Sequence, residues 1–311
     1  MHYTGTVWRP PYEAGSLLLE VTAGCTWHRC KFCTLYDDLP FRFRMTPPET
    51  VEADLREAQM LSHDPVGKLA ARLQNLPEPG GIRRVFLTGA NPFALAFDRL
   101  KTIAELVRRY LPSCETIGCF ARVTDAAGKT ESELAALREL GYTGLSIGVE
   151  TGHGPSLQFM DKGYGPEDII AQCRRLDAVG VSYRFLYLAG LPGAGRGTEG
   201  AVASAEVFNQ THPQIIGSSM LTVFPESRLY REIQAGNWAE AGELEKLEEV
   251  RTLVERLDIP VWFAALGASN AVRVQGVLPG DRGAVLSRLE AACDPAREES
   301  LRRYRAGLPH L

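Results

Sequence analysis

The sequence predicts an α/β fold, namely a partial (β/α)6 barrel followed by a mainly helical C-terminal extension. Short apolar runs with strand character alternate along the chain with segments of helical periodicity. This alternation is typical of parallel strands that are joined by right-handed crossover helices. Six βα units can be distinguished, whereas a closed barrel typically needs eight. We therefore expect an open barrel with a lateral gap for a substrate.

The first unit combines an apolar run at Leu17–Val21 with a cysteine-rich loop and a helix that has clear start signals. Thr46 is a suitable N-cap, Pro47 would take the first helical position, and Glu49 completes a capping box. A second capping box opens the helix that begins at Thr130. Further strands are predicted at 83–88, 115–120, 143–149, 181–188 and 215–223, and further helices at 98–111, 130–141, 166–179 and 198–209.

Two segments fall outside this alternation. The insertion at 63–81 is interpreted as a surface excursion with a short helix, and a lid is the alternative. After Pro225 the pattern becomes mainly helical, so we divide the chain into a barrel domain, 1–225, and a C-terminal extension, 226–311. A segment rich in Glu, Leu and Arg predicts an amphipathic helix with a solvated charged face. The elements expected in the extension are this helix at 240–257, a strand at 261–263, and helices at 281–293 and 295–306.

The composition is that of an ordinary globular enzyme. The 311 residues are 45% hydrophobic and 23% charged, and the net charge is −4. Because there is no basic surplus, the composition argues against nucleic acid as a tightly held partner. The N-terminus lacks the pattern of a signal peptide, and no run approaches eighteen apolar residues, which argues against a membrane protein. Seven unevenly spread cysteines indicate reduced thiols. We therefore expect a cytoplasmic protein.

Three cysteines, Cys25, Cys30 and Cys33, lie close together on one predicted loop. Three thiolates on a tight loop suit a metal that prefers sulfur ligands, and an iron–sulfur cluster fits best. A structural cluster normally takes four cysteines, so a [4Fe–4S] cluster on these three would leave one iron open. Zinc with His28 as fourth ligand is the alternative, but zinc sites usually draw paired ligands from two loops. A disulfide would need an even pairing and an oxidising compartment.

Other candidates lie where predicted strands end, because ligands of parallel α/β folds collect at the carboxyl ends of strands. The second strand ends in Thr88-Gly89-Ala90-Asn91, where a glycine would let backbone groups approach a ligand closely. A simple strand-to-helix turn is the alternative for this segment. The fourth strand ends in Glu150, whose carboxylate could accept two hydrogen bonds from a ribose diol.

Two arginines and one leucine complete the candidate set. Arg122 follows the third strand and Arg184 lies on the fifth, and each could clamp a carboxylate or pair with a structural acid. Leu188 could pack against an adenine ring, although apolar strand residues are core residues by default. The scattered positions of the remaining cysteines argue against a second cluster: Cys114, Cys119, Cys173 and Cys293.

The cysteine loop, with Phe32 directly before its last cysteine, resembles the cluster loop of the radical S-adenosylmethionine (radical SAM) superfamily. The usual spacing in that superfamily is three residues and then two, whereas here it is four and then two, as in some divergent branches. In that superfamily the open iron chelates the methionyl amine and carboxylate of the cofactor. The turn at Thr88–Asn91 is similar to the superfamily's turn for the methionyl amino group. The string Gly148-Val-Glu150-Thr-Gly152 resembles the segment whose acidic residue meets the ribose.

The resemblance extends over nearly the whole chain, and it includes a late motif. Ala268-Ser269-Asn270, followed by Gly276-Val-Leu-Pro279-Gly-Asp281, resembles one branch of mostly uncharacterised, single-domain members. Proteins of that branch often have a histidine just before this motif, and Gly267 stands in its place. If that histidine handles protons or substrate in the branch, its absence here argues against a shared substrate. Asn270 follows an apolar run, where it could face the barrel cavity or cap a turn.

The resemblance implies an enzyme that reductively cleaves S-adenosylmethionine at a [4Fe–4S] cluster to a 5′-deoxyadenosyl radical. It implies an external electron donor of the flavodoxin or ferredoxin type, and a small-molecule substrate is the default expectation. Two other functions stay open: a non-catalytic, cluster-binding carrier of a cofactor such as heme, and a zinc-stabilised RNA-modifying module. Fold and cofactor do not specify the substrate.

Overall fold

The computed structural model describes residues 1–62, 81–270 and 272–308, which form two compact units. Unit 1 contains the described residues of 1–26 and 38–146, together with the short segment 179–181. Unit 2 contains 27–37, 147–178 and the described residues from 182 onward. The predicted insertion at 63–81 lies, apart from Gly81, outside the described residues.

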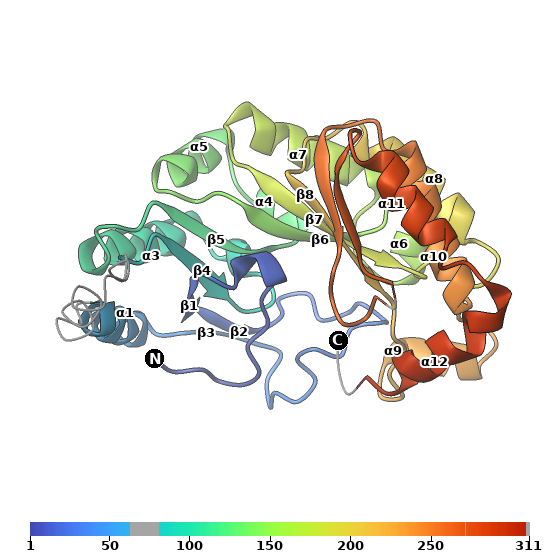
Figure 1. Cartoon of the computed structure of the whole chain (residues 1–311). Coiled ribbons are helices and arrows are strands. Elements are labelled where there is room, and N and C mark those ends of the chain that lie inside the picture. The colour runs from blue at the N-terminus through green and yellow to red at the C-terminus, as the bar shows by residue number, and fades with distance from the viewer. Residues whose placement is uncertain (63–80, 271, 309–311) are drawn as a thin grey trace, which may run out of the picture. The chain divides into compact units, whose positions relative to one another are not determined.

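The strands of unit 1 form a parallel ladder in the order β1 (Leu17–Glu20), β4 (Arg84–Thr88) and β5 (Thr116–Ala121). The short strands β2 (Thr22–Gly24) and β3 (Phe43–Met45) pair with each other in antiparallel fashion. Helix α1 packs against α3 and β1 (Figure 1). The helical segments of this unit are η1 (Pro11–Glu13), α1 (Pro48–Ser62), η2 (Pro92–Ala94), α3 (Phe97–Tyr110), α4 (Val123–Ala127) and α5 (Glu131–Glu139).

Local sequence signals explain where these helices begin and which face is buried. Thr130 and Glu133 form the predicted capping box at the start of α5. Helix α1 begins at Pro48, one residue later than predicted, because the Pro47 carbonyl accepts the hydrogen bond of Val51 N–H. The residues of α3 that recur at helical spacing are buried as predicted: Leu100, Ile103 and Val107.

The strands of unit 2 also form a mostly parallel ladder. Strand β8 (Ile215–Met220) pairs in parallel with β7 (Tyr183–Ala189) on one side and with β9 (Val261–Ala265) on the other. The edge strand β10 (Val274–Leu278) is antiparallel to β9. Strand β6 (Leu145–Glu150) belongs to both units, since the division between them falls after Ser146.

Helices pack beside the strands of unit 2, and α10 packs against α8, α11 and α12 (Figure 1). The helical segments are α6 (Gly154–Phe159), α7 (Pro166–Ala178), α8 (Gly197–Phe208), α9 (Arg228–Gln234), α10 (Glu243–Arg256), α11 (Arg282–Glu290), η3 (Pro295–Arg297) and α12 (Glu298–Ala306). No helix in the described ranges has both the length and the apolar character needed to cross a membrane.

The prediction of an α/β fold built from six βα units is confirmed by β1, β4, β5, β6, β7 and β8. The sequence did not predict β10. Gly276 lies in the middle of this strand, where a Cβ atom would come within 2.8 Å of Val285 on α11. A central glycine weakens the sequence signal of a strand, yet here it permits the close approach of a helix.

The predicted charged face of the helix at 240–257 is wrong in part. Three charged residues of α10 are buried rather than solvated, namely Glu243, Lys246 and Glu249. Lys246 pairs with Glu243 at 3.2 Å, and Glu243 pairs with Arg305 of α12 at 2.7 Å. Because each of these buried side chains has a partner of opposite charge or a hydrogen-bond partner, the helix can bury part of its polar side.

Candidate cofactor site

The predicted site residues fall in both units. Unit 1 contains Cys25, Thr88, Gly89, Asn91 and Arg122, whereas the residues in unit 2 are Cys30, Phe32, Cys33, Glu150, Arg184 and Leu188. All three cysteines of the loop are partly exposed. The remaining cysteines have protonated thiols, because burial raises the pKa of Cys119 and Cys173 most and that of Cys114 and Cys293 less. A neutral thiol is a poorer metal ligand than a thiolate.

Asn91 holds the first end of the cysteine loop in place. Its Nδ2 donates to the Thr26 hydroxyl at 2.7 Å, and its Oδ1 accepts from the Thr26 N–H at 3.3 Å. Nδ2 also lies 3.2 Å from both carboxylate oxygens of Asp125. The neighbouring Cys25 N–H donates to the Arg42 carbonyl at 2.9 Å. The polar atoms of Asn91 are thus engaged by protein groups that orient the residue next to Cys25.

Asp125 was not predicted from the sequence, although it anchors this part of unit 1. Its carboxylate accepts the Arg122 N–H at 2.7 Å, so Arg122 is the N-cap of α4. Burial raises the pKa of Asp125, whereas the hydrogen bonds from Arg122 and Asn91 oppose that shift. The Arg122 guanidinium contacts the Thr124 hydroxyl at 3.0 Å. A single aspartate after a strand carries no distinctive signal, and only its partners identify it.

The turn after β4 has the features expected of a backbone-lined ligand contact. Gly89 has φ +123°, and a Cβ atom there would lie 2.0 Å from the Thr22 hydroxyl, so only glycine fits. Thr88 is buried, and its hydroxyl oxygen has no hydrogen-bond partner among the residues described. A buried hydroxyl without a partner is uncommon and is suited to contact a ligand.

Within unit 2, the part of the cysteine loop around Lys31 is hydrogen-bonded to two neighbouring segments. Lys31 N–H donates to the Met160 carbonyl at 3.1 Å, and the Lys31 carbonyl accepts from Leu229 N–H of α9 at 2.7 Å. The Cys33 N–H donates to the Cys30 carbonyl at 3.2 Å, which closes a tight turn between the two cysteines. The Trp27 indole donates to the Asp161 carbonyl at 2.7 Å. The loop backbone is therefore fixed by its neighbours.

Glu150 has an uncommon backbone conformation at the end of β6. Its φ of +64° lies in the left-handed region, where non-glycine residues tend to occur at functional sites. Its Oε1 pairs with Lys162 Nζ at 3.2 Å, and Lys162 also donates to the Gly148 carbonyl at 3.0 Å. Oε2 accepts no hydrogen bond from any residue in the described ranges. That oxygen is available to a hydroxyl of a ligand.

Phe32 and Leu188 are brought together by an apolar group in unit 2. Leu188 belongs to its buried core, and Phe32 packs against that core. Lys162 Nζ lies 5.7 Å from the centre of the Phe32 ring, so the partner of Glu150 borders the same group. The other buried members of the apolar group are Met160, Leu191, Leu221, Leu229 and Trp238. Arg184 lies on β7 and is half-buried.

Two residues of α10 that the sequence did not indicate support the turn after β7. Glu249 accepts the Tyr187 hydroxyl at 2.6 Å and the Gly190 N–H at 2.8 Å. Gly190 has φ +93°, and a Cβ atom there would lie 3.0 Å from the Lys246 side chain. Burial raises the pKa of Glu249 to about 8. Helical spacing places both charged residues on α10, but it does not show that they face the protein interior.

The chemistry of the donors fits an iron–sulfur cluster better than zinc. No three His, Cys, Asp or Glu side chains of the described residues are already gathered around one point. His28 Nε2 is hydrogen-bonded to Asp37 at 2.7 Å, and a zinc ion would have to break this contact to use that nitrogen. The three thiols of one loop, without a fourth cysteine nearby in the sequence, match the donor set of a cluster with an open iron.

Comparison with known proteins places a large part of the chain in one family. Residues 19–199, more than half of the chain, match the family model of the radical SAM superfamily. The heme chaperone HemW of Bacillus subtilis (strain 168) is 24% identical over 157 residues, which cover 50% of this chain and 41% of that protein. The chain thus spans about two fifths of the length of this relative.

Two solved structures have a similar fold. Coproporphyrinogen III oxidase (HemN) from Escherichia coli, a radical SAM enzyme, aligns with a TM-score of 0.54 and 15% identity over 77% of this chain and 51% of its own. Methylornithine synthase (PylB) aligns with a TM-score of 0.51 and 16% identity over 93% of this chain and 85% of its own. At these identities the likeness concerns the fold alone.

Proposed function

Because this chain belongs to the radical SAM superfamily, we propose that it is a radical SAM enzyme that acts on a small-molecule substrate. A [4Fe–4S] cluster, when bound, would supply the electron that cleaves S-adenosylmethionine to methionine and a 5′-deoxyadenosyl radical, which abstracts a substrate hydrogen. The observation that carries this proposal is the three-cysteine loop, whose backbone is held between Met160 and Leu229.

In this proposal the thiolates of Cys25, Cys30 and Cys33 hold the cluster and leave one iron for the cofactor's amine and carboxylate. Glu150 accepts the ribose hydroxyls through Oε2, which is available for this role, while Lys162 orients the carboxylate from the other side. Hydrogen bonds that a carboxylate accepts are stronger than those between neutral groups.

The remaining candidates contact other parts of the cofactor. The buried Thr88 hydroxyl and the backbone beside Gly89 are proposed for the methionyl amino group. Leu188 is proposed to pack on the adenine ring, and Phe32 to shield the cluster from water. Either Arg122 or Arg184 is proposed to bind the cofactor carboxylate. The hydrogen bonds of Asn91 to Thr26 support a positioning role for this residue, through the loop next to Cys25.

Iron analysis of anaerobically purified protein tests this proposal. We expect a brown protein with about four irons per chain, and loss of iron in the alanine variants of Cys25, Cys30 or Cys33. Matched controls are the alanine variants of the remaining cysteines, which should keep their iron: Cys114, Cys119, Cys173 and Cys293. Stoichiometric zinc without visible absorbance would refute the cluster, and a selective loss of iron in a control would refute the ligand set.

A second candidate function is a non-catalytic carrier of heme. The likeness to a heme chaperone over 157 residues favours this alternative. Reconstituted protein with a reductant and S-adenosylmethionine separates the two functions. Formation of 5′-deoxyadenosine supports the enzyme, whereas changes in heme absorbance without 5′-deoxyadenosine support the carrier.

Further parts of the proposal concern the setting of the reaction. We propose that electrons come from an external flavodoxin- or ferredoxin-type donor and that the protein works in the cytoplasm. The division into a barrel domain, 1–225, and an extension, 226–311, is likewise a proposal. Limited proteolysis tests the division, because a domain boundary is expected to be cut before the elements on either side.

A further inference from the structure

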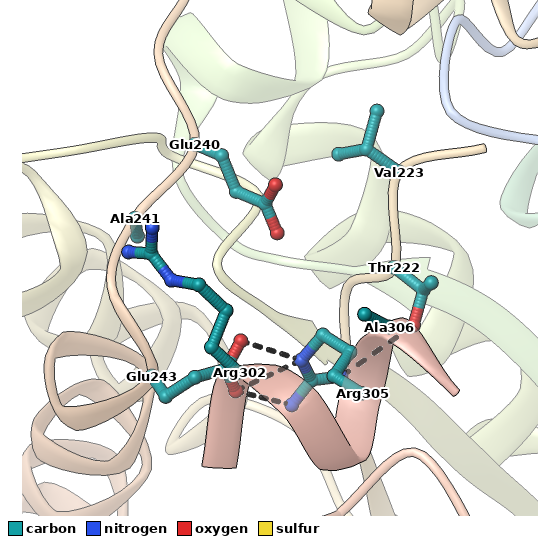
Figure 2. A pocket seen from close by; sticks show the side chains of 8 residues that line it. All are labelled: Thr222, Val223, Glu240, Ala241, Glu243, Arg302, Arg305 and Ala306. Carbon is teal, nitrogen blue, oxygen red and sulfur yellow. Dashed lines mark hydrogen bonds and ion pairs between the residues drawn. The ribbon is translucent and has the colours of Figure 1, made fainter. Parts of the chain in front are cut away.

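A pocket of about 270 Å³ lies in unit 2 at the carboxyl end of β8 (Figure 2). Thr222 and Val223, which follow β8, form one wall, and residues from the start of α10 and the last turns of α12 form the others. Ligands of parallel α/β folds collect at the carboxyl ends of strands. The volume is just below the roughly 300–1,000 Å³ that drug-sized ligands occupy, so the pocket suits a small metabolite.

One side of the pocket is suited to an anion. Arg305 is buried, and its Nε and Nη2 are both 2.7 Å from the carboxylate of Glu243. Its Nη1 has only long contacts, at 3.4 Å to the Met220 carbonyl and 3.5 Å to the Thr222 hydroxyl. Charge-assisted hydrogen bonds are normally about 2.7–2.9 Å long. Nη1 can therefore accommodate a carboxylate, to which the Thr222 hydroxyl can donate as well.

A second guanidinium group makes this side of the pocket still better suited to an anion. Arg302 lies one turn before Arg305 on α12 and also lines the pocket. Within the described part of the chain, its ion pair is with Glu298 at 3.4 Å, and its side chain is 64% exposed. This weak, exposed pair leaves the other guanidinium nitrogens able to turn toward a ligand.

The opposite side of the pocket is suited to a cation. Figure 2 shows the Glu240 carboxylate across the pocket from the Arg305 guanidinium. Oε1 of Glu240 accepts from Lys246 at 2.7 Å, whereas Oε2 has no donor among the residues that the structure describes. Two carboxylates, Glu240 and Glu243, face two cations, Lys246 and Arg305, so these four charges cancel. An anion would contact only the arginine side of the pocket, whereas a ligand with both charges contacts both sides.

We propose that this pocket binds a small zwitterion that carries an amino group and a carboxylate, as a free α-amino acid does. The carboxylate contacts Arg305 Nη1, the Thr222 hydroxyl and Arg302, and the ammonium group contacts Glu240 Oε2. Small apolar side chains complete the walls, and they favour a ligand with a short side chain: Val223, Ala241 and Ala306.

The pocket borders the apolar group that carries two of the proposed cofactor contacts. Val223 lines the pocket and packs against the same buried core as Phe32 and Leu188. A ligand in the pocket therefore lies next to that group. The proposal concerns binding alone, so it can fail or hold independently of the proposed S-adenosylmethionine chemistry.

Binding of free L-amino acids to the anaerobically purified full chain, measured by calorimetry, tests the proposal. At least one amino acid with a short side chain is expected to bind more tightly than about 1 mM, a free energy of about −4 kcal/mol. Its N-acetyl and methyl ester derivatives, each lacking one charge, should bind roughly tenfold or more weakly. Absence of any binder, or equal binding of a derivative, overturns the proposal.

Variants of the pocket residues test whether the amino acid binds in this pocket. Glu240→Gln and Arg302→Gln should each weaken binding roughly tenfold, whereas Arg303→Gln should have no effect because Arg303 is 75% exposed and outside the pocket. Thr222→Val removes the hydroxyl beside Arg305 and should also weaken binding, while Arg305 keeps its ion pair with Glu243. S-adenosylmethionine also contains a zwitterion, so the titration is repeated in its presence at saturation. Competition between the two ligands, or unchanged binding in the pocket variants, overturns the proposal.

Discussion

Replacement of Glu249 by glutamine is expected to change how the stability of the protein depends on pH. Glu249 is fully buried, and burial raises its pKa to about 8, from an ordinary value of 4.5. Below this pKa the carboxyl group is protonated; in the structure one of its oxygens accepts the Tyr187 hydroxyl and the other accepts the Gly190 N–H. A glutamine amide has the same shape and stays neutral over this pH range. Its oxygen can accept the Gly190 N–H, and its NH2 group can donate to the Tyr187 hydroxyl oxygen.

The sign and size of the effect follow from proton linkage. Between the unfolded pKa of 4.5 and the folded pKa of about 8, the folded state binds more protons than the unfolded state. Its stability therefore falls as the pH rises through this window, by up to about 1.4 kcal/mol per pH unit. From about pH 6 to pH 9 the wild-type protein should lose about 2–3 kcal/mol through this group, a loss that Glu249→Gln removes.

Anaerobic urea unfolding at pH 6, 7, 8 and 9, followed by circular dichroism, measures the difference between the two proteins. The Glu249→Gln variant should match the wild-type protein near pH 6 and exceed its stability at pH 9. Glu255→Gln is the control, because Glu255 lies on the same helix and its side chain is 50% exposed. A difference between Glu249→Gln and wild type that stays constant from pH 6 to pH 9 would refute a protonated Glu249.

Three further predictions concern Glu150, Gly163 and Asn270. Glu150→Ala should leave the cluster absorbance intact and raise the dissociation constant of S-adenosylmethionine roughly ten- to hundredfold in calorimetry; an unchanged constant contradicts the ribose contact. Gly163→Ala should lower the unfolding free energy more than Gly195→Ala, because both have φ +76° but only at Gly163 would a Cβ atom meet an indole ring, at 2.4 Å. Equal losses would exclude that contact as the cause. Asn270→Ala should keep its iron and lose about 1–3 kcal/mol of stability, because a buried β8 carbonyl loses its donor at 2.9 Å. Loss of iron with unchanged stability would contradict a structural role for this hydrogen bond.

For Asn270 the sequence left two roles open, and the structure shows what its side chain contacts. Its side chain is buried, and Nδ2 donates to the Ser218 carbonyl of β8 as well as to the Gly267 carbonyl. The motif therefore ties the turn after β9 to the neighbouring strand. Its Oδ1 is buried without a hydrogen-bond partner among the described residues, which leaves one polar atom for a ligand or a water.

The sequence alone determined the order of the elements, the starts of several helices and the three-cysteine loop. These features depend on residues that are close together in the chain. The capping box of Thr130 and Glu133 spans one turn, and the thiol ligands lie within one loop. Local hydrogen bonds, side-chain periodicity and ligand type are enough to predict such features.

Only the tertiary structure decided which charged and polar side chains are buried and what they hold. Asn91 reaches Thr26 across 65 residues of sequence, and Glu249 reaches Tyr187 across 62. Neither partner can be read from helical or strand periodicity, because periodicity defines a face but not what packs against it. The polar side of α10 is buried because α12 and the turn at Gly190 supply partners for its carboxyl groups. In isolation the same helix would present that side to water, since an unpaired buried charge is strongly unfavourable.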